Sequence, residues 1–234
     1  MKKMWIFVAC LMVLLLVGSA SAEKPDKEPV DKMVLIHYKD KVDTKTLSAT
    51  DTATTYKLLG VKWKVFPVRY YVNPPSGLNN AEVLSNVSAG FNAWDLKTSK
   101  TLFQYAGTTT DIKVGVLNGK NTVSWEPIDN TNIIASTTIW YTRNTKEIVE
   151  TDIQMNSKLP WGMDPDAEGP VRISGTFDVR NIVTHESGHV CGLADLYTSG
   201  SSELTMYGYS SLGEVKKDSL GKGDILGLQK MYGK

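Results

Sequence analysis

The chain has 234 residues, of which 41% are hydrophobic and 22% are charged, and these fractions exclude a disordered, collagen-like or coiled-coil protein. With 26 basic and 25 acidic residues the formal net charge is +1, so no overall basic field favours nucleic acid as a partner. The length suits one mid-sized domain with an extension.

The first 22 residues have the pattern of a secretory signal peptide. Two lysines precede an apolar run from residue 4 to residue 17, and Ala20 and Ala22 form an A-x-A cleavage site. The run is shorter than the roughly 20 apolar residues that a membrane-spanning helix needs. We therefore expect residues 1–22 to be removed, the mature protein to be secreted, and no stable membrane span to remain after cleavage.

The next segment, residues 23–55, is a poor core builder. It opens with solvated and turn-forming residues, contains a short strand-like stretch at 33–36, and continues into a threonine-rich stretch. Three interpretations stay open for it: a linker, a short propeptide-like segment or an accessory strand.

From residue 56 onward the pattern is that of a folded domain. Strands are expected at 65–72, 102–105, 112–117 and 133–141, and a hairpin turn joins the last of these to a strand at 148–155. Asn79 can cap a helix whose core stripe includes Phe91 and Trp94. Further helices are expected at 176–191 and 222–232. This order predicts an α+β fold with helices packed on one sheet.

The most informative stretch lies on the helix that ends near Cys191. His185 and His189 are four residues apart, so one helix face can present both imidazoles to a single metal ion. Glu186 lies one step round the helix, within reach of a water molecule at that metal. This is the H-E-x-x-H arrangement. The alternative is two unrelated histidines on an ordinary helix, but the chain has 3 histidines in all, and chance placement in this pattern is on the order of one in several hundred.

A catalytic zinc ion takes three protein ligands and keeps its fourth position for water. Gly192 can end the helix in a left-handed conformation and turn the chain back. Asp195 follows three residues later, and its carboxylate can close the site. We therefore predict a metal site formed by His185, His189 and Asp195, with Glu186 as the catalytic base.

With these residues the chain resembles the matrixin-like branch of the metzincin metalloproteases. The extended motif H-E-x-x-H-x-x-G-x-x-[H/D] of that family matches His185, Glu186, His189, Gly192 and Asp195. Weaker matches extend over about residues 60–234: an opening strand and first helix, a cleft-edge strand at 150–156, a methionine turn at 204–207 and a final helix at 223–233.

The resemblance implies a metzincin-like catalytic domain at residues 56–234. Its fold would be a twisted, mixed five-stranded sheet with an antiparallel edge strand, an active-site helix and a C-terminal helix. It also implies one catalytic Zn²⁺, with Met206 supporting the site by packing. The substrate would be a protein or peptide bound as an extended strand near residues 148–155.

The chain departs from the family pattern in three places. Matrixins usually carry His where this chain has Asp195, and an aspartate there is similar to the snapalysin type. Outside the motif the one remaining histidine is His37, so we expect no second, structural zinc. No cysteine lies between residues 23 and 190, so a thiolate latency switch is missing from the sequence. Inhibition by the N-terminal segment would have to use a carboxylate, His37 or steric cover.

The predicted function is that of an exported zinc endopeptidase, expected to be a monomer. Two alternatives remain: a catalytically inactive, metal-stabilised binding or adhesion module of the same fold, and a hydrolase that acts on other bonds. Calcium is a further candidate cofactor, because Asp164, Asp166 and Glu168 offer oxygen ligands in one loop. Acidic residues beside glycine and proline are more often simply solvated.

Overall fold

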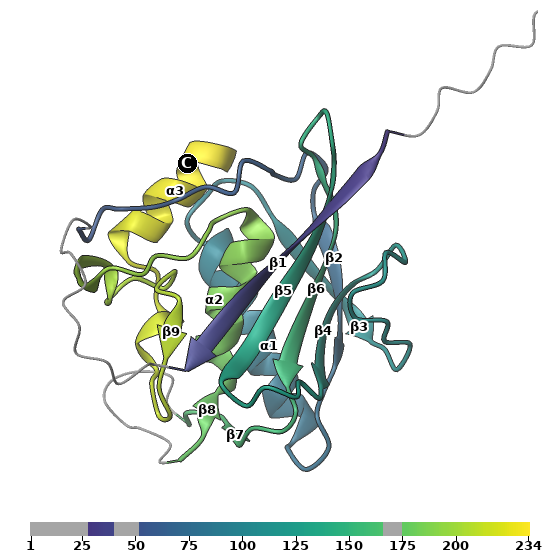
Figure 1. Ribbon diagram of the computed structural model, residues 1–234, viewed down its shortest axis with the longest axis vertical. Coiled ribbons are helices and arrows are strands. Elements are labelled where there is room, and N and C mark those ends of the chain that lie inside the picture. The colour runs from purple at the N-terminus through teal and green to yellow at the C-terminus, as the bar shows by residue number, and fades with distance from the viewer. Residues whose placement is uncertain (1–27, 40–51, 166–174) are drawn as a thin grey trace, which may run out of the picture.

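The computed structural model describes residues 28–39, 52–165 and 175–234, so the predicted signal peptide lies outside the described residues. Its main layer is a seven-stranded sheet in the order β3-β2-β4-β6-β5-β1-β9 (Figure 1). The strands of this sheet are β1 (Val30–Lys39), β2 (Val68–Asn73), β3 (Phe103–Thr108), β4 (Asn121–Glu126), β5 (Ile133–Thr142), β6 (Ile148–Asn156) and β9 (Tyr209–Ser210). A separate parallel pair consists of β7 (Trp161–Gly162) and β8 (Phe177–Asp178).

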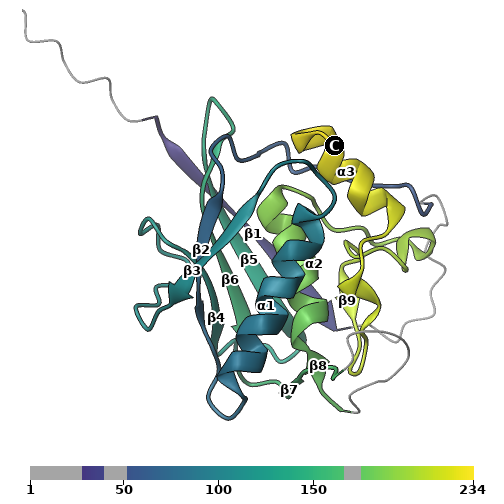
Figure 2. The ribbon, with the colours of Figure 1, turned by 180° about the vertical axis from the view of Figure 1, so that it is seen from behind.

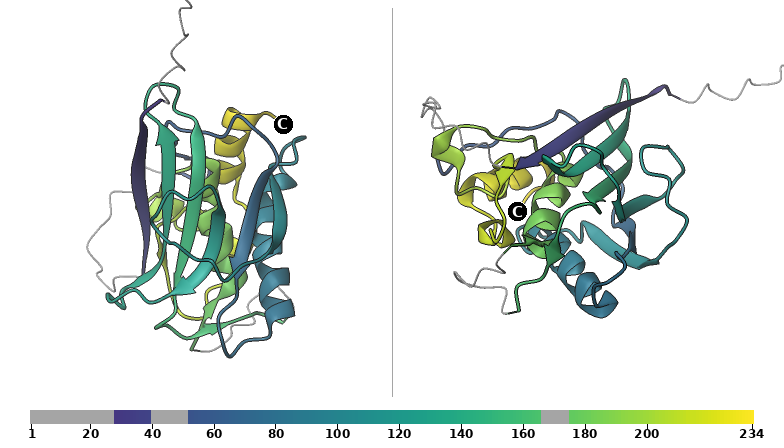
Figure 3. Two further views of the ribbon diagram at one scale, coloured as in Figure 1. Left: turned by 90° about the vertical axis from the view of Figure 1, so that its right-hand side faces the viewer. Right: turned by 60° about the horizontal axis from the view of Figure 1, so that its bottom comes forward.

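Three α-helices accompany the sheet: α1 (Asn80–Asp95), α2 (Val179–Cys191) and α3 (Lys222–Tyr232). Two short 3-10 turns lie at Ser199–Ser201 and Lys216–Asp218. Helices α1 and α2 lie side by side against one face of the sheet (Figures 2 and 3). This arrangement confirms the predicted α+β fold. Within the described ranges, no helix combines the length and the apolar character needed to cross a membrane.

Strand direction in the sheet matches the predicted mixed pattern. β3, β2, β4 and β6 run parallel to one another, and β5 runs antiparallel to β6. These five strands are the predicted five-stranded sheet with an antiparallel member at its end. β1 then pairs antiparallel with β5 and parallel with β9, which brings the sheet to seven strands.

Several local predictions are confirmed, one predicted strand is wrong and one strand was missed. The Asn79 side chain caps α1 by accepting hydrogen bonds from the backbone N–H groups of Ala81 (3.0 Å) and Glu82 (3.3 Å). Helix α3 has the predicted bounds. The strand expected at 112–117 is wrong, because that stretch is a loop with Val116 and Leu117 exposed. The strand β4 was not predicted.

The predicted location of the substrate strand is also wrong. Strand β6 (Ile148–Asn156), which contains all of residues 148–155, is hydrogen-bonded on one side to β4 and on the other to β5. A strand with two partners has no free backbone groups for a peptide to pair with. Strand β6 is therefore not an edge strand of the sheet.

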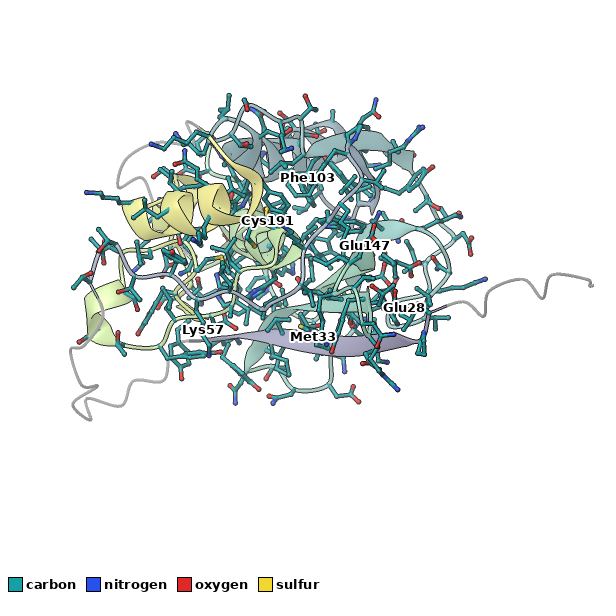
Figure 4. The ribbon with its side chains drawn as sticks, turned by 90° about the horizontal axis from the view of Figure 1, so that it is seen from above. Glu28, Met33, Lys57, Phe103, Glu147 and Cys191 are labelled. Atoms are coloured by element: carbon teal, nitrogen blue, oxygen red, sulfur yellow. The ribbon has the colours of Figure 1, made fainter. Side chains whose placement is uncertain are left out.

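Indole hydrogen bonds fix helix α2 in the core. Trp94 of α1 donates its Nε1–H to the carbonyl oxygen of Thr184 (2.9 Å), and Trp63 donates its own to that of Val190 (2.9 Å). At the C-terminal end the Tyr232 hydroxyl of α3 donates to the carbonyl oxygen of Cys191 (2.7 Å). The Cys191 thiol is buried there, and burial raises its pKa, as expected for a packed helix-end residue rather than a nucleophile. Figure 4 labels Cys191 near the middle of the molecule.

A buried acidic group lies at the opposite end of α2. Asp178 caps the helix by accepting from the Asn181 N–H (2.7 Å), and Asp218 is buried nearby with Arg180 Nε 3.9 Å from its carboxylate. Burial, together with the charges of Asp178 and Asp164, raises the pKa of Asp218 to about 8, although Arg180 opposes the shift. The folded protein therefore holds a proton here that the unfolded chain loses near pH 4.

This raised pKa gives a stability prediction with a definite sign. Because the folded-state pKa of Asp218 is raised, its contribution is fully present below the unfolded pKa and is lost as the pH rises toward 8. Asp218→Asn should therefore stabilise the protein by at least about 1 kcal/mol at pH 9 and have little effect at pH 4. Urea unfolding at both pH values measures this. The exposed Asp129→Asn serves as control, and an equal effect at both pH values would exclude the buried-proton explanation.

Candidate metal centre

The four residues predicted to form the site converge in the interior of the protein. His185, Glu186 and His189 lie on α2 with no exposed side-chain surface, and Asp195 follows the end of the helix with 7% exposure. One ligand atom from each of His185, His189 and Asp195 lies within 4.8 Å of the others. The structure thus brings together the three residues that the spacing indicated.

Hydrogen bonds to backbone carbonyls orient both imidazoles. His185 Nδ1 lies 2.7 Å from the carbonyl oxygen of Thr205, and His189 Nδ1 lies 2.8 Å from that of Leu193. A carbonyl oxygen can only accept, so each Nδ1 carries a hydrogen, and in the neutral imidazole each Nε2 presents a lone pair. This is the tautomer and the orienting bond that a metal-ligating histidine needs.

The lone pairs of the two histidines face the same carboxylate oxygen. Asp195 Oδ1 is 3.2 Å from His185 Nε2 and 3.4 Å from His189 Nε2. A tetrahedral zinc site with bonds of about 2.0–2.1 Å separates its ligand atoms by roughly 3.3 Å. All three atoms are buried and have no hydrogen-bond donor among the described residues. Three buried acceptors at these distances fit a shared cation, and they fit zinc in particular because two are imidazole nitrogens.

The electrostatics of the site also favour positive charge. Burial lowers the pKa of the His189 imidazole, but the Asp195 carboxylate more than offsets this and raises the pKa to about 9. In turn, burial raises the pKa of Asp195, while the imidazoles of His189 and His185 lower it well below its usual range. The pair therefore holds a cation at neutral pH, either a proton or a metal ion that replaces it.

Gly192 connects the helix to the third ligand. Its backbone adopts φ 102°, which ends α2 in the left-handed conformation, and the Leu193 N–H then bonds back to the carbonyl oxygen of Gly188 (3.0 Å). The same reversal brings the Leu193 carbonyl oxygen within hydrogen-bond distance of His189 Nδ1 and brings the Asp195 carboxylate close to the histidines. A Cβ atom added at Gly192 would lie 2.5 Å from the carbonyl oxygen of Val61.

Gly192→Ala should therefore lower the free energy of unfolding by more than an alanine at a left-handed position usually does. Gly60 offers a matched control, because it also has positive φ (80°) but no heavy atom within 4 Å of an added Cβ. We expect Gly60→Ala to destabilise the protein by about 1 kcal/mol and Gly192→Ala by at least about 1 kcal/mol more, with weaker metal retention. Chemical denaturation and metal analysis of both variants measure these effects. Equal losses would show that the close approach to Val61 is unimportant.

Glu186 is held on both of its carboxylate oxygens. Oε1 lies 3.2 Å from Nδ1 of His37 on β1, and Oε2 accepts a hydrogen bond from Thr137 Oγ1 on β5 (2.6 Å). Burial raises the pKa of Glu186, but the bond from His37 and the neighbouring imidazoles lower it below its ordinary value overall. Glu186 is therefore an ionised carboxylate, which is the form that can accept a proton.

Sequence patterns identified neither Thr137 nor Asp224 as supporting residues, and they named His37 only as a residue that the N-terminal segment could use for inhibition. Thr137 and His37 lie on strands far from α2 in sequence, so no local spacing connects them to Glu186. Asp224 of α3 accepts hydrogen bonds from the N–H groups of Thr205 (2.9 Å) and Met206 (3.1 Å), and so fixes the turn whose carbonyl orients His185. Its place in the first turn of the helix is typical of a capping carboxylate, which is the one available signal.

Met206 lies where the resemblance placed it. Its side chain is 1% exposed, and a Cβ added at Gly188 of α2 would lie 2.2 Å from its sulfur atom. The sulfur thus packs directly on the metal-site helix. Of the calcium candidates, Asp164 is buried and its N–H donates to Asp178 Oδ2 (2.8 Å), whereas Asp166 and Glu168 lie outside the described residues.

A comparison with protein families shows which family the chain belongs to. The family model described as Matrixin matches residues 62–233, which include the metal centre, α1 to α3 and the five strands from β3 to β5 in sheet order. The chain belongs to the matrixin family. No individual curated protein matches this matrixin. The family suggests a zinc-dependent metalloprotease with a peptide substrate, and the match leaves β1 outside its limits.

Proposed function

We propose that this matrixin is an exported zinc endopeptidase that hydrolyses peptide bonds with an activated water molecule. His185, His189 and Asp195 hold the ion, and Asp195 replaces the histidine that the family more often uses. Zn²⁺ in this site supplies a Lewis acid that polarises the scissile carbonyl and lowers the pKa of an adjacent water. The observation that supports catalysis, rather than metal binding for stability, is the buried carboxylate of Glu186, which has an oxygen within 4.8 Å of a His185 ring nitrogen.

Glu186 is the general base and then the general acid in this proposal. Its carboxylate takes a proton from the water as the water oxygen bonds to the carbonyl carbon. The carbon–nitrogen bond then breaks, and Glu186 delivers the proton to the leaving amine. Thr137 keeps the carboxylate pointed into the site through its 2.6 Å bond to Oε2.

The substrate binds in this proposal as an extended strand beside β5. In the part of the chain that matches the family, β5 is the last strand of the sheet and has β6 as its one partner. A peptide can therefore add to β5 by backbone hydrogen bonds, which select for extended conformation more than for side-chain identity. Thr137 of β5 contacts Glu186, so a peptide on this edge passes the catalytic base.

Casein hydrolysis tests the proposed function. The zinc-loaded chain should cleave casein, a chelator should stop the cleavage, and added zinc should restore it. The digest should be followed for hours at high protein concentration so that slow turnover is measured. A zinc-loaded, folded chain that cleaves no peptide bond under these conditions would instead be a metal-stabilised binding module.

A further inference from the structure

Strand β1 occupies the edge of the sheet at which a peptide would bind. It runs antiparallel to β5, with residue pairs from Val30 opposite Thr142 to His37 opposite Ala135. Its end then runs parallel to β9, where Tyr38 and Lys39 pair with Tyr209 and Ser210. Figure 1 shows β1 lying along β5, and no other strand of the described residues borders β5 on that side.

β1 does not belong to the matched catalytic domain. The family match begins at residue 62, whereas β1 ends at Lys39. The domain therefore supplies the open edge of β5, and the preceding segment fills it. An unpaired edge strand is a ready template for any extended segment, and a tethered segment has an effective concentration in the millimolar range for a short linker.

One face of β1 points into the site. Because side chains alternate along a strand, Met33, Leu35 and His37 share the inner face, while Val34 is 49% exposed on the outer face. Met33 and Leu35 pack against the hydrophobic core. His37 has no exposed surface, and its ring centroid lies 3.8 Å from that of His185. Figure 4 labels Met33 on the ribbon of β1.

His37 forms a hydrogen bond directly with the proposed catalytic base, Glu186. Its Nδ1 donates to Oε1 of Glu186, and Thr137 holds the other oxygen, so both carboxylate oxygens are taken. The Nε2 atom of the same ring is buried without a hydrogen-bond partner among the described residues. With β1 in place, Glu186, His185 and His189 are fully buried, so a peptide and its attacking water reach them only while β1 is away from β5.

The opposite end of β1 is fastened to the β5–β6 turn. Arg143 donates to both carboxylate oxygens of Asp31, with Nη2 2.7 Å from Oδ1 and Nε 3.1 Å from Oδ2. Glu28 accepts hydrogen bonds from the backbone N–H groups of Asn144 (2.5 Å) and Thr145 (2.7 Å). These contacts are on the surface and contribute little stability each, but they set the register that brings His37 to Glu186.

We propose that β1 is a built-in competitor that occupies the substrate edge and keeps the protein latent, with His37 as the residue that positions it on Glu186. The proposal rests on the proposed function, because latency has meaning only for an enzyme. Substrate access then requires β1 to leave β5. This control acts through a strand and a histidine, so it does not need the cysteine that a thiolate latency switch would use.

A reversible disulfide tests whether β1 must leave. Ile36 and Ser136 are directly opposite in the register and both are half-buried, so a double variant Ile36→Cys with Ser136→Cys can lock β1 onto β5. In the full chain, oxidation should lower peptide hydrolysis at least tenfold, and a reductant should restore it. The two single-cysteine variants should respond to neither treatment. An oxidised double variant that cleaves as fast as its reduced form would overturn the proposal.

His37→Ala tests the positioning role, with Val34→Ala as the matched substitution on the outer face. His37→Ala should raise hydrolysis at least tenfold and speed hydrogen exchange at the β1 and β5 amides, whereas Val34→Ala should do neither. Unchanged exchange in His37→Ala would contradict the role of this residue. The exchange measurement needs no turnover, so it stays decisive even in a preparation that cleaves nothing.

A binding assay separates failure of this proposal from failure of the proposed function. The probe is a fluorescein-labelled peptide with the sequence of residues 30–39, read by anisotropy without turnover. It should bind the His37→Ala chain and not the oxidised double variant. If the peptide binds the His37→Ala chain but not the oxidised double variant, and neither chain hydrolyses peptides, then β1 occupies the edge and the proposed enzyme activity is rejected. Equal binding to both chains would reject β1 as the occupant.

Discussion

Replacing Glu186 by glutamine should lower peptide hydrolysis by about 10²–10⁴-fold while zinc stays bound. The amide keeps the shape of the side chain but cannot take a proton from water at neutral pH. The three ligands do not include Glu186, so the metal content should remain at one ion per chain. Steady-state hydrolysis of a quenched fluorescent peptide, together with metal analysis of the same sample, measures both quantities.

Glu150→Gln is the matched control for that experiment. Glu150 is also buried (1% exposed), but its carboxylate accepts backbone hydrogen bonds from the loop at Asn118 and Gly119. This variant should retain hydrolysis near the wild-type rate in the fraction that folds. If Glu186→Gln cleaved peptides as fast as the Glu150 variant, Glu186 could not be the base.

Removing the third ligand should have the largest effect on metal binding. Asp195→Ala leaves two imidazoles, and we expect its zinc affinity to fall by more than about 100-fold, beyond the 10–100-fold loss that outer-shell changes cause. We expect this loss because Asp195 Oδ1 lies close to the Nε2 atoms of both His185 and His189, where it can share one metal ion with them. Competition with a chromophoric chelator measures the affinity.

Asp195→His distinguishes loss of a ligand from damage to the fold. The family motif that the chain resembles allows histidine or aspartate at this position, so an imidazole there should restore much of the zinc affinity that alanine loses. The restored site would carry one negative charge fewer, since neutral imidazole replaces a carboxylate. Undiminished zinc affinity in Asp195→Ala would show that the carboxylate is not a ligand.

The convergence of the four candidate site residues was predictable because its information is local. His185, Glu186 and His189 lie within two helical turns, and Gly192 encodes the reversal that returns Asp195, so spacing and one backbone preference suffice. The bounds of α3 and the Asn79 cap of α1 were equally accessible, since capping residues and apolar periodicity are properties of short windows, whereas α2 begins at Val179, three residues after its predicted start. The prediction of helix α3 succeeded for this reason.

Features that depend on distant pairing were not predictable in the same way. Residues 112–117 are apolar enough to suggest a strand, but they lie outside the sheet, whereas β4 takes its place between β2 and β6. The open edge was assigned to β6 because a sequence does not state which strand lies last in a sheet. The contact of His37 with Glu186 spans 149 residues, and no periodicity reports a contact of that range.

In the proposed site, a single zinc ion holds two imidazoles and one carboxylate together. Metal analysis after purification and dialysis against zinc-free buffer tests this claim most directly. We expect one zinc per wild-type chain and less than a tenth of that in His189→Ala, with circular dichroism showing that both chains are folded. A folded wild-type chain that retains no zinc, or a His189→Ala chain that retains as much as the wild type, would contradict the claim.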